Sequence, residues 1–144
     1  MAPVFSALAS RPDLFDVKIC VTGQHREMLD QVMSIFGMKA HFDLNIMTQG
    51  QDVTDITAKV LFNLKEVFKK EKPDRVLVHG DTTTTLASSL AAFYAKVPVA
   101  HVEAGLRTGN LSAPWPEEMN RNVTSVLADL HFAPTESAKK KDRK

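Results

Sequence analysis

The sequence contains a single cysteine, Cys20, and no long apolar run. One cysteine cannot form an internal disulfide, and a membrane helix needs about 18 or more consecutive apolar residues. The first residues also lack the basic start and apolar middle of a signal peptide. We therefore expect a cytoplasmic protein with no membrane association.

An excess of positive charge is also absent, because 18 basic residues face 17 acidic ones and leave a formal charge of +1. A protein that binds a phosphate backbone usually carries a clear basic excess, so we expect no nucleic-acid partner. Neither glycine-rich phosphate motif, G-x-G-x-x-G or G-x-x-x-x-G-K-[ST], occurs, and there is no G-x-S-x-G serine motif. These absences argue against an NAD enzyme, a P-loop ATPase and a serine hydrolase, and no cofactor is expected.

The 144 residues, 44% of them hydrophobic, suit one globular domain with its own core. Short runs rich in valine and isoleucine alternate with segments of helical period, which is typical of βα units around a parallel sheet. The pattern predicts strands at residues 17–21, 44–47, 75–79, 97–102 and 131–133. It predicts helices at residues 1–9, 26–36, 53–72, 86–95 and 117–130, with the lysine-rich end either a solvated tail or a short helix.

Polar side chains follow several of the predicted strands. In an open parallel sheet, ligands bind outside the carboxyl ends of the strands. Asp81, Glu103 and either Glu117 or Glu118 would supply carboxylates at that rim, where proton transfer needs one group as base and another as acid. Gly80, Asp81 and four threonines at a helix start could hold an anion, or Asp81 could simply cap its own helix.

A metal site is a second possible interpretation of the same rim. His79 with Asp81, and His101 with Glu103, each place two possible ligands on one face of a strand. Both histidines precede the strand ends and could equally be satisfied core residues. We therefore expect no metal, and a metal-dependent hydrolase stays an alternative.

Four stretches resemble the bacterial non-hydrolysing UDP-N-acetylglucosamine 2-epimerases, in the same order along the chain. They are CVTGQHREM at 20–28, VHGDTTTTL at 78–86, HVEAGLRTG at 101–109 and PWPEEMNR at 114–121. The similarity extends from the first residue to about Ser137. It implies an isomerase that acts without NAD or metal and interconverts UDP-N-acetylglucosamine and UDP-N-acetylmannosamine for cell-surface polysaccharide synthesis.

The resemblance also implies roles for individual residues. UDP would leave across C1 and C2 to give 2-acetamidoglucal and then add back, with proton transfer and sugar orientation by Asp81, Glu103 and Glu117. The substrate-binding candidates are Arg107, Arg121 and Thr82. The positions that resemble a regulatory UDP-N-acetylglucosamine site are Gln24, His25 and Glu27.

The implied fold is α/β, with a Rossmann-like parallel sheet that forms one half of a glycosyltransferase-B-like, two-domain enzyme. Residues 1–144 would be most of the N-terminal domain, without its first strand and without the C-terminal UDP-binding domain. We expect such a piece to be inactive alone, and the full-length parent to be a homodimer that binds UDP-N-acetylglucosamine and UDP. A nucleotide-sugar-binding module without turnover is the remaining alternative.

Overall fold

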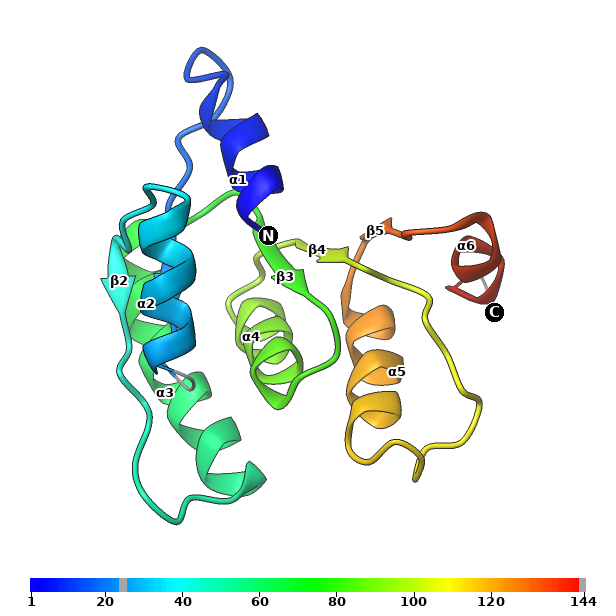
Figure 1. The fold of residues 1–144 in the computed structure, drawn as a ribbon. Helices are drawn as coiled ribbons and strands as arrows, with labels where there is room; N and C mark the ends of the chain where they lie inside the picture. The colour runs from blue at the N-terminus through cyan, green and yellow to red at the C-terminus, as the bar shows by residue number, and fades with distance from the viewer. Residues whose placement is uncertain (24–25, 143–144) are drawn as a thin grey trace. The chain divides into compact units, whose positions relative to one another are not determined.

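A computed structural model describes residues 1–23 and 26–142. The chain divides into two compact units, Met1–Gly50 and Gln51–Lys144. Each is an α/β unit with a parallel sheet, and Figure 1 labels their helices and, except for β1, their strands.

In its described residues, the first unit contains a two-stranded parallel sheet and two helices. Helix α1 (Ala2–Ala9) has a proline in its first turn, a position where the missing N–H costs nothing. Strand β1 (Cys20–Val21) pairs with β2 (Phe42–Asp43), and α2 (Arg26–Ile35) lies between them in sequence. Gly37 follows α2 with φ +59°, as expected for a residue just past a helix end.

The strand predicted at residues 44–47 is wrong, because β2 lies at Phe42–Asp43. Asn45 has a left-handed backbone with φ 44°, which ends the extended conformation that the apolar pattern suggested. Arg26 donates to Asp43 at 2.7 Å and to Asn45 at 3.0 Å, and these bonds fix the turn. Polar contacts to Arg26, 17 and 19 residues away in sequence, therefore outweighed the apolar pattern.

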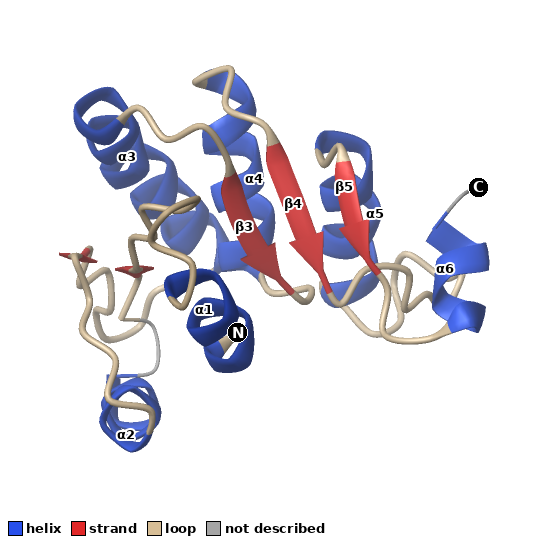
Figure 2. Ribbon diagram, turned by 90° about the horizontal axis from the view of Figure 1, so that it is seen from above, coloured by secondary structure: helices blue, strands red, loops and turns tan. Residues whose placement is uncertain are grey.

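The second unit has a three-stranded parallel sheet in the order β3 (Val76–His79), β4 (Val99–Val102) and β5 (Leu130–Phe132). Helices α4 (Thr83–Tyr94) and α5 (Glu117–Leu127) contact the sheet, and α3 (Val53–Glu71) packs beside α4 (Figure 2). Short helix α6 (Glu136–Asp142) follows the last strand. The predicted alternation of strands and helices is confirmed here.

Helix α3 shows why these segments fold as they do. Ile56, Val60, Leu64 and Phe68 recur every four residues and are all buried. Asp52 caps the helix by accepting from the backbone N–H groups of the first turn at 2.8 and 2.9 Å. This apolar face packs α3 against α4, and α4 in turn contacts β3 and β4.

Candidate functional site

Two left-handed backbone positions shape the carboxyl ends of β3 and β4. Gly80 has φ +74° directly after β3, and Glu103 has φ +67° directly after β4. The buried His101 ring donates from Nε2 to the Gly80 carbonyl at 2.7 Å. These turns bring Asp81 and Glu103, which are 22 residues apart, to the same rim of the sheet.

Helix α5 joins the two carboxylates through Arg121, whose side chain is only 3% exposed. Its Nη2 atom lies 2.6 Å from Asp81 Oδ2 and 3.5 Å from Glu103 Oε2. Its Nη1 atom donates to the Glu103 backbone carbonyl. Asn120 adds a bond from Nδ2 to the Asp81 carbonyl at 2.8 Å.

Asp81 therefore pairs with a buried guanidinium and does not cap its own helix. The cap of α4 is Thr82, whose hydroxyl accepts from Thr85 N–H at 3.2 Å.

A cavity of about 320 Å³ opens beside these groups, wholly within the second unit. Asp81 and Arg121 line it together with Glu117, the first residue of α5. Glu117 Oε2 is buried and has no hydrogen-bond partner in the described part of the chain. Leaving a buried carboxylate oxygen unpaired costs free energy. A ligand in this cavity that donates a hydrogen bond to Glu117 Oε2 would remove that cost.

The structure brings some of the predicted site residues together and leaves others apart. Asp81, Glu103 and Arg121 meet directly, and Glu117 and Arg107 share the cavity wall with Asp81 and Arg121. Thr82 is exposed and serves as the helix cap.

The predicted regulatory positions fall in the first unit. Glu27 is exposed in the first turn of α2, whereas Gln24 and His25 lie outside the described residues. The regulatory assignment therefore stays a prediction.

Within residues 1–23 and 26–142, no three histidine, cysteine or acidic side chains are grouped as a metal site would require. His101 instead supports the Gly80 turn. Among the helices of the same residues, none combines the length and apolar content needed to cross a bilayer.

Sequence reasoning named Glu118 only as an alternative to Glu117, and it missed Asn120 entirely. Both are buried, as are Arg121 and Thr124 of the same helix, whereas Val126 is 83% exposed. The polar residues 117, 120, 121 and 124 recur at helical spacing. Helical spacing therefore places them on one face of the predicted helix, but nothing in the sequence indicates that this polar face is the buried one.

Gly80→Ala tests how closely the Glu103 carboxylate approaches the Gly80 backbone. A left-handed alanine costs about 1–2 kcal/mol, and its Cβ would lie 3.2 Å from Glu103 Oε2. We expect the free energy of unfolding, measured with urea, to fall by about 2 kcal/mol. Gly109→Ala is the matched control, because Gly109 has φ +80° and open space around the added Cβ. Equal losses in the two variants would contradict the close approach of Glu103 to Gly80.

Comparisons with known proteins match this chain to a single enzyme family. A family model described as UDP-N-acetylglucosamine 2-epimerase matches residues 6–142. The UDP-N-acetylglucosamine 2-epimerase of Escherichia coli K12 is 60% identical over 139 residues, which cover 96% of this chain and 37% of the relative. The Campylobacter jejuni enzyme is 55% identical over 94% of this chain and 35% of its own length. The chain therefore spans little more than a third of the length of these curated relatives.

Solved structures agree with this match. The Neisseria meningitidis UDP-GlcNAc 2-epimerase, bound to UDP-GlcNAc, has a TM-score of 0.95 and 57% identity over 99% of this chain and 38% of its own. The Methanocaldococcus jannaschii enzyme, in complex with UDP-GlcNAc and UDP, has a TM-score of 0.89 and 37% identity, with the same coverage. These matches confirm the predicted α/β fold class, with its parallel sheet of the glycosyltransferase-B-like type. The chain belongs to the UDP-N-acetylglucosamine 2-epimerase family.

Proposed function

We propose that this chain supplies the proton-transferring carboxylates of an enzyme that inverts C2 of UDP-N-acetylglucosamine. The observation that carries the proposal is the meeting of Asp81 and Glu103 on the buried Arg121, beside the cavity that Glu117 lines. Family membership supports the same chemistry, since a relative of known structure binds UDP-GlcNAc.

The proposed reaction begins when a carboxylate takes the C2 proton. The C2–H electron pair forms a C1=C2 double bond, and the C1–O bond breaks with its electron pair leaving on UDP. The product of this half is 2-acetamidoglucal. UDP then adds back to C1 while a proton returns to C2 from the opposite face, which gives UDP-N-acetylmannosamine.

The residues of this chain suit that sequence of steps. Removing a weakly acidic C2 proton needs a base held in place before the substrate arrives. Arg121 fixes the direction of Asp81 and the backbone of Glu103, while Glu117 extends from a different element. Carboxylates on different elements could serve opposite faces of the sugar, as inversion requires, and no metal or redox cofactor is needed for the atoms to balance.

The proposal is tested with a hybrid enzyme in which the 139 aligned residues of this chain replace the matching segment of the Escherichia coli relative. In deuterated water we expect proton NMR to show deuterium at C2 and the appearance of a second UDP-sugar. A folded hybrid that shows neither would overturn the proposal. Binding of UDP-N-acetylglucosamine without exchange would favour a binding module, and loss of turnover with a chelator would favour a metal-dependent enzyme.

The remaining assignments extend the same proposal. Residues 1–144 would form most of an N-terminal Rossmann-like domain of a cytoplasmic homodimer. The partners would be UDP-N-acetylglucosamine and UDP, with Gln24, His25 and Glu27 at a regulatory nucleotide-sugar site.

A further inference from the structure

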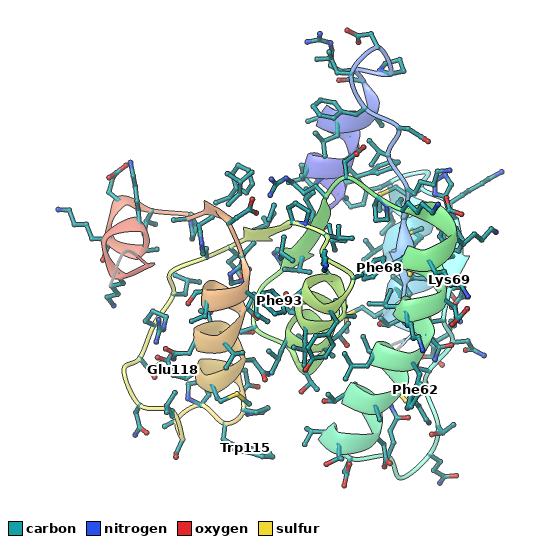
Figure 3. All side chains as sticks on the ribbon, turned by 180° about the vertical axis from the view of Figure 1, so that it is seen from behind. Phe62, Phe68, Lys69, Phe93, Trp115 and Glu118 are labelled. Carbon is teal, nitrogen blue, oxygen red and sulfur yellow. The ribbon has the colours of Figure 1, made fainter. Side chains whose placement is uncertain are left out.

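Glu118, the second residue of α5, binds the loop that follows β4 (Figure 3). Its side chain is 2% exposed. The carboxylate accepts from the backbone N–H groups of Thr108 at 3.0 Å and Gly109 at 3.1 Å, and from Arg107 Nε at 3.0 Å. Asn122 Nδ2 adds a bond at 3.2 Å from the next turn of the helix. A buried carboxylate therefore fastens the loop to the start of α5.

The electrostatics favour this fastening. Burial alone would raise the pKa of Glu118, but the two backbone amides and the Arg107 guanidinium outweigh it and lower that pKa. Hydrogen bonds to a charged carboxylate are about twice as strong as neutral ones. Arg107 is held from α5 a second time, because its Nη2 donates to Asn122. The Arg107 guanidinium is thus bound to two residues of α5, although Arg107 also lines the cavity.

The neighbouring Glu117 has no comparable support. Its Oε2 atom makes no hydrogen bond in the described part of the chain, and Pro116 gives α5 no side-chain cap. The direction of Glu117 therefore depends on the backbone of the first turn of α5. Glu118 is the side chain that holds that turn to the loop.

We infer that Glu118, together with Arg107, is a positioning residue that sets the direction of Glu117 and the shape of the cavity wall. This inference rests on the proposed function and adds to it a residue that acts through Glu117. It also assigns the Arg107 guanidinium to holding the loop against α5 and not to binding the substrate. Glu118 also lines the cavity, but its carboxylate oxygens already accept from Arg107, Thr108 and Gly109 of the loop.

The test is Glu118→Gln in the hybrid enzyme, with Glu66→Gln on the exposed part of α3 as control. Glutamine presents an NH₂ group where the loop offers only donors, so the fastening is weakened. Because a misplacement of about 1 Å can cost about 100-fold in rate, we expect kcat to fall about 10- to 100-fold with KM nearly unchanged. Arg107→Lys keeps the positive charge but cannot bind Glu118 and Asn122 through separate nitrogens, and it should lower kcat by a smaller factor. A rise in KM at constant kcat would overturn the inference.

A second measurement on the 144-residue chain separates this inference from the proposed function. In Glu118→Gln we expect faster hydrogen exchange at the Thr108 and Gly109 amides and a lower NMR order parameter for the Glu117 side chain. Glu66→Gln should change neither. An unchanged Glu117 order parameter would overturn the inference whatever the turnover. A lower order parameter together with a folded, inactive wild-type hybrid would leave the positioning role intact and reject the proposed function.

Discussion

Asp81→Asn and Glu117→Gln are each expected to lower kcat of the hybrid enzyme by about two to four orders of magnitude, the usual loss when a general acid or base is removed. Both substitutions preserve size. Asparagine also keeps an oxygen that can accept from Arg121, which now lies 2.6 Å from Asp81 Oδ2. The fold should therefore survive, and the loss should appear in the rate of net inversion at C2.

Two exposed acidic residues of the same unit provide matched controls. Asp74→Asn and Glu66→Gln make the same chemical changes at exposed positions away from the cavity, so turnover should stay within about 2-fold of the unchanged hybrid. Circular dichroism checks the fold of all four variants. Near-normal turnover in Asp81→Asn and Glu117→Gln would reject their role in proton transfer.

The direction of the reaction distinguishes the two carboxylates. A base for one sugar is the acid for the other, because the proton enters and leaves C2 on opposite faces. A variant that lacks one of them could still exchange C2 hydrogen in the sugar served by the other, without net inversion. Incubating each UDP-sugar separately in deuterated water should therefore show exchange in only one of the two for each variant.

Regular elements with strong local signals were predictable from the sequence. Helix α3 carries its apolar stripe, an acidic N-cap and a proline just beyond its end, and it forms at Val53–Glu71 against a prediction of 53–72. Strands β3 and β4 follow from their valine-rich runs. In these segments, local propensity and tertiary packing favour the same structure.

Helix ends and polar contacts were less predictable. Helix α4 begins at Thr83, three residues before the prediction, because the Thr82 hydroxyl caps it. Helix α5 ends at Leu127, and the chain is already extended at Leu130 in β5. Asn45 ended β2 early through contacts to residues distant in sequence. Such boundaries depend on individual hydrogen bonds, some local and some tertiary, that apolar periodicity does not record.

The candidate site was predictable only as a location. Asp81 and Glu103 were expected at the rim because each follows a strand, and the structure brings them to the same guanidinium. The burial of Glu118, Asn120 and Arg121 could not be inferred from hydropathy, because such residues are normally exposed. Their burial is tolerated since Glu118 and Arg121 each have several hydrogen-bond partners and Asn120 donates to the Asp81 carbonyl.

Arg121→Met should combine the loss of activity with a clear loss of stability. The methionine fills much of the space but leaves the Asp81 carboxylate and the Glu103 carbonyl without their donors. Removing one partner of a fully buried ion pair costs about 3–5 kcal/mol. The cost should be smaller here because the two carboxylates are 34% and 38% exposed. We therefore expect the free energy of unfolding to fall by about 2–3 kcal/mol and kcat to fall by at least about 100-fold.

Arg75→Met is the control for this prediction, because Arg75 also pairs with a carboxylate but does so at the surface. Its Nη2 atom donates to Asp129 Oδ2 at 2.9 Å, and the two side chains are 32% and 54% exposed. An exposed pair contributes about 0–1 kcal/mol, so urea denaturation should show a loss of less than about 1 kcal/mol and turnover should be retained. If both variants lost the same stability and Arg121→Met kept its turnover, the buried guanidinium would not be what orients Asp81 and Glu103. The proton-transfer site would then have to be organised by other groups.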